Sequence, residues 1–270
     1  MTNIGNEKPD SLKRQGSNWV VPRNRLYKFH EQIQDELMAA VEPILFGGFE
    51  KNFEIVERFE KAFCAWRGYS YAAAVSSGSA SLSVGLHAIG VGRGDEVITA
   101  ANSDMADTNA IEVCGADVVL CDIRENDYNI DVDKVEALIT DKTKAILAIS
   151  LFGNPADVKR LRPIADRYGI KILEDAALST CSTDYGSPLG FYADAVAFST
   201  AATKPIGGMA FGGVIATNNK EIYDRAKMFS DYGVMGGSNS GIPDLSSHLV
   251  DGDNLRMHPI DAAYLLVKMP

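Results

Sequence analysis

The sequence predicts an α/β fold of three layers, in which helices cover both faces of a mainly parallel sheet of seven strands. From residue 70 onward, short apolar runs alternate with stretches of helical length, and this alternation is typical of parallel strands joined by crossover helices. The apolar runs are also nearly continuous, as expected for strands buried on both faces. Ligands of such sheets bind beyond the carboxyl ends of the strands. Functional residues are therefore expected just after these runs.

Seven apolar runs are predicted to be the strands: Tyr71–Val75, Glu96–Ala100, Asp117–Cys121, Ala145–Leu151, Ile170–Leu173, Ala195–Phe198 and Gly213–Ala216. The helices predicted among them cover residues 79–89, 104–113, 131–139, 157–168 and 219–231, and a last helix covers 262–270. Ahead of the sheet, apolar side chains recur at helical spacing in two further segments. The first contains Ile33, Leu37, Val41 and Leu45, and the second contains Phe53, Val56, Phe59, Phe63 and Trp66.

Composition limits the class of protein. The chain has 270 residues, of which 46% are hydrophobic and 23% charged, and its formal net charge is −10. These proportions suit a globular domain, and the acidity disfavours nucleic-acid binding, which needs a basic face. We expect no membrane span and a cytoplasmic location, because no apolar run is long enough to cross a bilayer and the N-terminus lacks the apolar core of a signal peptide. Residues 1–20 are expected to form a flexible arm, and residues 21–270 one large domain.

The cysteines and histidines give no metal signal. The four cysteines show no CxxC or similar spacing, and the four histidines are scattered along the chain. Buried free thiols in a reducing compartment are the simpler interpretation of the cysteines. No metal site is therefore predicted.

The first candidate for chemistry follows the run Tyr71–Val75, where small residues lead into a helix. Gly78 and Ser79 stand in the sequence SSGSASL, residues 76–82. Backbone N–H groups at a helix N-terminus, together with the helix dipole, suit a phosphate group. An ordinary serine-capped turn gives the same sequence, and for this segment alone the ordinary turn is the better interpretation.

The second candidate is the acidic pair Glu174-Asp175, which directly follows the run Ile170–Leu173. A carboxylate at the carboxyl end of a strand is placed to meet a ligand. An exposed loop acid or a helix cap is the alternative. The small neighbours Ala176 and Ala177 make the loop tight and favour a functional acid.

The third candidate is Lys204, which comes shortly after the run Ala195–Phe198. It is the only lysine or arginine between Lys171 and Lys220. A desolvated lysine shifts its pKa readily, and its neutral amine forms a Schiff base with a carbonyl. A solvated loop lysine is the alternative. Taken in order, a phosphate cradle, an acid and a lysine are what a pyridoxal phosphate site requires.

These residues resemble the DegT/DnrJ/StrS-type sugar aminotransferases, which belong to the aspartate-aminotransferase superfamily. Beyond SSGSASL, the resemblance rests on GDEVI (94–98), TNAI (108–111), TKAI (143–146), LFGNPAD (151–157), EDAA (174–177), FSTAATK (198–204) and GDNLRM (252–257). Each motif is weak alone, and their common order and spacing make the set specific. The resemblance runs from about residue 27 to the end of the chain.

The resemblance implies a role for each matching residue. Lys204 would hold pyridoxal 5'-phosphate covalently and act as the general base, and Asp175 would pair with the pyridine nitrogen. The phosphate would be bound by Gly78, Ser79 and Ser199. Asn254 would reach the phosphate of a neighbouring subunit, since the active sites of the family lie at a homodimer interface.

The resemblance also implies a reaction and a domain plan. An amino group from glutamate or glutamine would pass to a keto group of a nucleotide-linked deoxysugar or a cyclitol. Residues 21–270 would be the cofactor-binding large domain, and the smaller C-terminal domain of the family is expected to be absent. The chain departs from the family at two positions: Asp104 stands where an aromatic ring usually stacks on the cofactor, and Leu178 stands where glutamine or histidine usually bonds its 3-hydroxyl.

Three other functions remain as alternatives. The departures at Asp104 and Leu178 would also suit a non-catalytic relative that acts as a binding or partner subunit. A sugar dehydratase that uses pyridoxamine phosphate is disfavoured, because such relatives carry histidine in place of Lys204. A nicotinamide-dependent dehydrogenase is disfavoured further, since no GxGxxG follows the first strand.

Overall fold

The computed structural model describes residues 30–48, 50–234 and 251–269. The expected arm, residues 1–20, lies outside these ranges. The chain divides into two compact units, residues 1–34 and 35–270, and the architecture below is that of the second.

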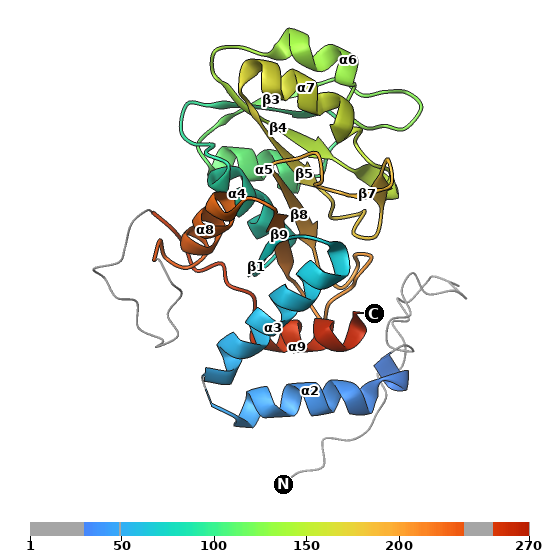
Figure 1. The fold of residues 1–270 in the computed structure, drawn as a ribbon, viewed down its shortest axis with the longest axis vertical. Helices are drawn as coiled ribbons and strands as arrows, with labels where there is room; N and C mark the ends of the chain where they lie inside the picture. Colours follow the sequence, from blue (N-terminus) through green and yellow to red (C-terminus); the bar gives the residue numbers. More distant parts are fainter. Residues whose placement is uncertain (1–29, 49, 235–250, 270) are drawn as a thin grey trace, which may run out of the picture. The chain divides into compact units, whose positions relative to one another are not determined.

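A seven-stranded sheet forms the centre of this unit (Figure 1). Its strands lie in the order β1-β9-β8-β5-β4-β2-β3. β9 is antiparallel to both of its neighbours, and all other neighbouring pairs are parallel. The mainly parallel sheet is thus confirmed. The strands are β1 (Tyr71–Val75), β2 (Glu96–Ala100), β3 (Asp117–Cys121), β4 (Thr143–Ile149), β5 (Lys171–Asp175), β8 (Ala195–Ser199) and β9 (Gly213–Thr217).

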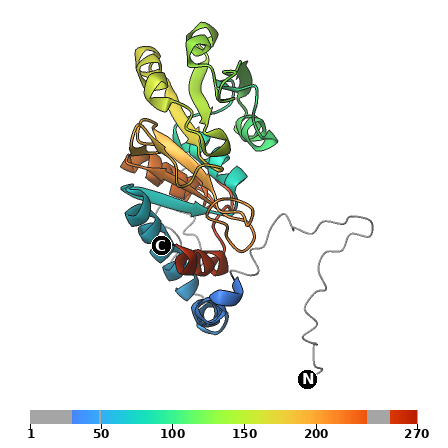
Figure 2. The ribbon, with the colours of Figure 1, turned by 90° about the vertical axis from the view of Figure 1, so that its right-hand side faces the viewer.

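Helices cover both faces of the sheet, which confirms the three layers (Figures 1 and 2). α4 (Gly78–Ala88), α5 (Met105–Val113) and α8 (Lys220–Phe229) pack on one face. α3 (Glu50–Arg67) and α9 (Pro259–Lys268) pack on the other face near β1, and α6 (Val132–Val135) and α7 (Val158–Tyr168) pack on that face farther along the sheet. α2 (Gln34–Phe46) precedes them and buries none of its side chains among the described residues.

Alternation along the strands explains why both faces are apolar. On β1, Ala73 and Val75 belong to the core beneath α4, whereas Ala72 and Ala74 belong to the core beneath α3 and α9. Successive side chains of a strand point to opposite faces. A strand covered on both sides therefore needs apolar residues at nearly every position, and this is the pattern seen in the sequence.

Several predicted strand boundaries were wrong by one or two residues, the carboxyl ends of β4 and β5 by two, and one small element was missed. The strand predicted as Ala145–Leu151 ends at Ile149, because the chain turns into a 3₁₀ segment, η2 (Leu151–Gly153), in which Phe152 has a φ of 55°. The strand predicted as Ile170–Leu173 continues to Asp175. The missed element is a hairpin of β6 (Thr183–Asp184) and β7 (Ser187–Pro188). Its two-residue turn, Tyr185-Gly186, has positive φ at both positions, as a type I′ turn requires.

Helices agree with the prediction to within a few residues. The helix predicted over 131–139 divides into α6 and a 3₁₀ segment, η1 (Glu136–Leu138). The last helix begins earlier than predicted, at Pro259, because the side chain of His258 caps it by accepting the N–H of Ile260.

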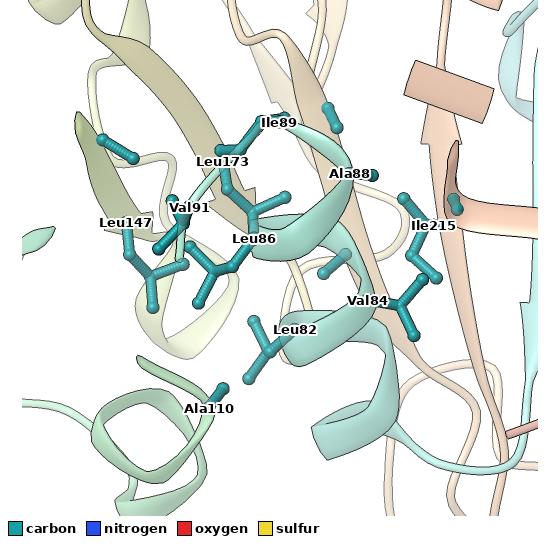
Figure 3. Packing of buried hydrophobic residues seen from close by; sticks show 14 of the residues in the cluster. Leu82, Val84, Leu86, Ala88, Ile89, Val91, Ala110, Leu147, Leu173 and Ile215 are labelled. Atoms are coloured by element: carbon teal, nitrogen blue, oxygen red, sulfur yellow. The ribbon is translucent and has the colours of Figure 1, made fainter. Parts of the chain in front are cut away.

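The core between α4 and the sheet is closely packed (Figure 3). Leu82 and Leu86 of α4 lie against Leu147 of β4 and Leu173 of β5. All four side chains are at most 3% exposed. This contact fixes α4, whose first residues Gly78 and Ser79 are candidates for the site.

Truncating Leu86 to alanine is expected to lower the free energy of unfolding by about 2–5 kcal/mol, because a fully buried leucine leaves a cavity that its neighbours fill only in part. Leu120→Ala is the matched control, since Leu120 is 56% exposed. Urea denaturation of both variants checks the difference. Equal losses at the two positions would contradict the packing described here.

Membrane-spanning helices and clusters of metal ligands are both absent from the described residues. No helix in these ranges is long and apolar enough to cross a membrane. Within the same residues, no group of three or more histidine, cysteine, aspartate or glutamate side chains could hold a metal ion. All four cysteines are free thiols.

Candidate functional site

The N-terminus of α4 has the geometry of an anion-binding turn. Ser77 caps the helix, because its Oγ accepts the N–H of Ala80 at 3.0 Å and its carbonyl accepts the N–H of Ser81 at 3.0 Å. Among the described residues, no hydrogen bond is donated by the N–H of Gly78 or Ser79. These two groups are the free donors that a helix N-terminus offers to an anion.

Ser199 lies directly beside this turn. It is the last residue of β8, it is buried, and its Oγ accepts the N–H of Ala201 at 3.3 Å. A Cβ atom on Gly78 would lie 2.7 Å from the Cβ of Ser199. Only a glycine at position 78 allows the start of α4 and the end of β8 to approach so closely. The structure thus brings together Gly78 and Ser199, which were both predicted from motifs far apart in the sequence.

Asp175 ends β5 and is buried at the carboxyl edge of the sheet. Its Oδ1 accepts the N–H of Ala177 at 2.7 Å. Burial raises the pKa of this carboxyl group, while the Ala177 hydrogen bond, a hydrogen bond with Asp107 and the positive charge of Lys204 act in the opposite direction. Lys204 therefore lies within electrostatic reach of Asp175.

The loop that carries Lys204 is folded back over the end of β8. Thr200 anchors it: its N–H donates to the carbonyl of Gly212 at 2.9 Å, and its own carbonyl accepts the N–H of Gly208 at 2.7 Å. The N–H of Lys204 donates to the carbonyl of Ala201 at 2.9 Å. These bonds hold a half-buried lysine above the sheet edge.

Asp107 is part of this site and was missed in the sequence. It lies in the first turn of α5, it is completely buried, and its carboxyl group lies close enough to that of Asp175 for a hydrogen bond once one of the two carries a proton. Burial and the neighbouring charge of Asp175 raise the pKa of Asp107 to about 9. The only sequence signal is the spacing of Asp104 and Asp107, which form a capping box at the start of α5. That spacing predicts the cap and gives no hint of the partner.

Glu174 and Asp175, which the sequence presents as a pair, point to opposite faces of the sheet and have separate partners. Glu174 accepts the Oγ–H of Ser150 at 2.6 Å and the N–H of Gly190 at 2.5 Å. Burial raises the pKa of Glu174 to about 7, against the effect of these two bonds. Glu174 therefore connects β5 to Ser150, just after β4, and to Gly190, between β7 and β8. Of the two acids, only Asp175 belongs to the candidate site.

The structure gives the surroundings of Asp104 and Leu178, the two departures from the resemblance, and of Asn254, the expected phosphate contact. Asp104 is exposed and caps α5, its Oδ1 accepting the N–H of Ala106 at 3.0 Å. Leu178 is half-buried and brings no polar group. Asn254 is exposed, and its Oδ1 accepts the Nε–H of Arg256 at 3.1 Å. The segment that holds Asn254 runs beside β1, since the carbonyl of Leu255 accepts the N–H of Ser76 at 2.7 Å.

Asp107→Asn is expected to raise the free energy of unfolding near about pH 8 by at least about 1.4 kcal/mol, the free energy that corresponds to one pKa unit, because the buried carboxyl group must take up a proton on folding at that pH and the amide need not. The pKa of Asp107 is higher in the folded than in the unfolded chain, so its contribution is fully present only at acidic pH and is lost as the pH rises towards 9. The gain should vanish near about pH 4.

Urea denaturation at the two pH values measures this difference. Asp122→Asn is the control, because Asp122 pairs with Lys134 at 2.6 Å and its pKa is lowered. That variant should show no gain in alkaline solution. A gain for Asp107→Asn that is the same at both pH values would contradict the shift.

Comparison with known proteins identifies the class. The model of the DegT/DnrJ/EryC1/StrS aminotransferase family matches residues 31–270. The chain belongs to this family.

Individual relatives agree with that assignment. The chain is 34% identical over 205 residues to dTDP-3-amino-3,4,6-trideoxy-alpha-D-glucose transaminase of Micromonospora megalomicea subsp. nigra, covering 76% of this chain and 55% of the relative. It is 32% identical to a pleiotropic regulatory protein of Geobacillus stearothermophilus, covering 93% and 65%. The crystal structure of NtdA from Bacillus subtilis with bound cofactor PMP superimposes with a TM-score of 0.82 at 31% identity, covering 92% of this chain and 55% of that one. The chain therefore spans just over half to about two-thirds of the length of these relatives.

Proposed function

We propose that the chain is a pyridoxal phosphate-dependent aminotransferase. It would pass an amino group from glutamate or glutamine to a keto group of a nucleotide-linked deoxysugar or a cyclitol. The observation that carries the proposal is the placing of Lys204 within reach of buried Asp175, at the same sheet edge where free N–H groups of α4 meet Ser199. The named sugar transaminase among the relatives supports the class of substrate.

The residues fit the cofactor at three points. The N–H groups of Gly78 and Ser79, with the hydroxyl of Ser199, would hold its phosphate, because that turn offers unpartnered donors at a helix N-terminus. Asp175 would face the ring nitrogen, and the amine of Lys204 would bind the aldehyde. The bound cofactor of a solved relative supports this assignment.

The chain's own groups would then divide the work of the reaction. Pyridoxal phosphate, when bound, supplies an electron sink for the α-carbon of the amino donor. Lys204 would move the proton at that carbon as general base. Asp175, anionic and desolvated, would stabilise positive charge on the ring nitrogen, since buried charges interact more strongly than solvated ones. Neither Asp104 nor Leu178 offers the ring a stacking partner or a hydrogen bond to its 3-hydroxyl, so affinity would depend on the phosphate cradle, Asp175 and Lys204.

The proposal extends to assembly and location. A homodimer with shared active sites would place Asn254 against the phosphate of the partner's cofactor, and the exposure of Asn254 supports this role. A cytoplasmic location is supported by the four free thiols, which persist in a reducing compartment.

Turnover of a keto-sugar tests the function. The purified chain is incubated with pyridoxal phosphate, glutamate and a dTDP-linked 3-keto-deoxysugar, and the amino-sugar nucleotide is followed by mass spectrometry. The proposal expects the amino sugar to form in step with 2-oxoglutarate. A chain that binds the cofactor but yields neither product from any keto-sugar or cyclitol ketone would instead support the non-catalytic alternative, a binding or partner subunit.

A further inference from the structure

We propose that Asp107 is a positioning residue for the cofactor: it keeps a proton in its hydrogen bond to Asp175 and so fixes the direction and charge of the carboxylate that meets the ring nitrogen. This inference rests on the proposed function, and it adds a residue that the phosphate cradle, Asp175 and Lys204 do not include.

Asp107 is held in place from its own side. Its Oδ2 accepts the N–H of Asp104 at 3.1 Å, and its N–H donates to the carbonyl of Asp104 at 3.0 Å. Its Oδ1 is buried and has no donor among the described residues. The side chain therefore cannot turn away from Asp175 without breaking the capping box of α5.

Two buried carboxyl groups that contact one another need a proton between them. Asp107 is completely buried and Asp175 is 7% exposed, so water cannot screen the repulsion of two anions. No ion pair within the described ranges joins either carboxylate to a lysine, arginine or histidine. A proton shared between the two carboxyl groups removes this repulsion and gives the unpartnered Oδ1 of Asp107 a hydrogen-bond partner.

The surrounding charges decide which of the two groups carries that proton. Asp104, at the start of α5, disfavours negative charge on both carboxyl groups. Lys204, in the loop after β8, favours it on Asp175, whose Oδ1 also accepts the N–H of Ala177. Glu174, on the other face of β5, interacts unfavourably with the charge of Asp175. Burial raises the pKa of both carboxyl groups, but the contact between them raises the pKa of Asp107 and lowers that of Asp175, so the balance puts the proton on Asp107 and the charge on Asp175.

Asp175 is then fixed through two donors, the N–H of Ala177 and the carboxyl O–H of Asp107. Supporting hydrogen bonds of this kind orient a functional group and tune its basicity. Asp107→Asn should preserve the role, because the amide N–H donates to Asp175 while the amide oxygen accepts the N–H of Asp104. Asp107→Leu removes the donor and leaves a side chain of similar size.

The first experiment uses the cofactor-free chain labelled with ¹³C at the aspartate carboxyl carbons. In a pH titration by NMR, one carboxyl signal should titrate above neutral pH, disappear in Asp107→Asn and persist in the control Asp104→Asn. An Asp107 signal that titrates in the ordinary acidic range would overturn the proposal.

The second experiment measures pyridoxal phosphate bound to wild type and to both Asp107 variants, with ¹⁵N in the cofactor ring. Asp107→Asn should keep the wild-type affinity and ring-nitrogen signal. Asp107→Leu should lose about tenfold in affinity, the effect of one hydrogen bond to a charged group, and should shift that signal. Wild-type values in a folded Asp107→Leu chain would overturn the positioning role. If Asp107→Leu does not fold, the signal in Asp107→Asn decides, because a signal unlike that of wild type would overturn it as well.

The two experiments separate the proposals. A wild-type chain that takes up no cofactor would contradict the proposed function. The titration of the cofactor-free chain would still decide whether Asp107 keeps its proton beside Asp175.

Discussion

Lys204→Ala is expected to abolish covalent attachment of pyridoxal phosphate and to reduce transamination by at least about 10³-fold. A single general base typically contributes about 10²–10⁴-fold, and in the proposed mechanism Lys204 also binds the cofactor. The variant should fold normally, because Lys204 is half-buried and its hydrogen bond to the carbonyl of Ala201 is donated by its backbone N–H. Turnover and the visible absorption of the bound cofactor are the two measurements.

Lys220→Ala is the matched control for this variant. Lys220 is also a lysine at the end of a loop, but it pairs with Asp224 on the exposed side of α8. Its loss should leave the absorption and turnover unchanged. If Lys204→Ala kept the absorption band of the wild type, another residue would have to bind the aldehyde.

Gly213→Ala is expected to have the second largest effect, because it would push the phosphate cradle away from the sheet. Gly213 lies in β9 between Val75 and Ser199. A Cβ atom there would lie 2.3 Å from the carbonyl oxygen of Ser77 and 3.0 Å from that of Phe198. Both contacts are with backbone, so neither can be relieved by turning a side chain.

Overpacking of this kind costs about 1–3 kcal/mol, which corresponds to a fall of about 2–4 °C in Tm for each kcal/mol in a chain of this size. Since Ser77 caps α4, its displacement should also lower the affinity for pyridoxal phosphate by about tenfold or more. Gly92→Ala is the control, because a Cβ at Gly92 meets nothing within 4 Å. Unchanged affinity in Gly213→Ala would show that the cradle does not bind the phosphate.

Much of the fold follows from local pattern. The boundaries of β1, β2 and β3 agree with the prediction, because each is a short, mainly apolar run that a polar residue bounds on at least one side. The hairpin of β6 and β7 could not be predicted, since each strand has two residues and no apolar run. The end of β4 was placed too late because Ser150 and Leu151 continue the run in sequence while the backbone turns.

The candidate site was predictable where function depends on position along a strand. Gly78, Asp175 and Ser199 all lie at or just beyond strand ends, as the α/β pattern requires. Asp107 could not be predicted, because it lies on α5, which follows β2 in the chain, whereas its partner Asp175 lies on β5. β4 separates β2 from β5 in the sheet. The separation of Glu174 from Asp175 follows from strand alternation, but only once β5 is known to extend through both residues.

The central claim is that Lys204 binds pyridoxal phosphate at a site built by Asp175 and the start of α4. The most direct test is to load the full chain with pyridoxal phosphate, reduce it with borohydride, digest it and locate the pyridoxyl group by mass spectrometry. We expect one stoichiometric label, on Lys204. A chain that remains unlabelled, or a label distributed over exposed lysines such as Lys61 and Lys220, would contradict the claim.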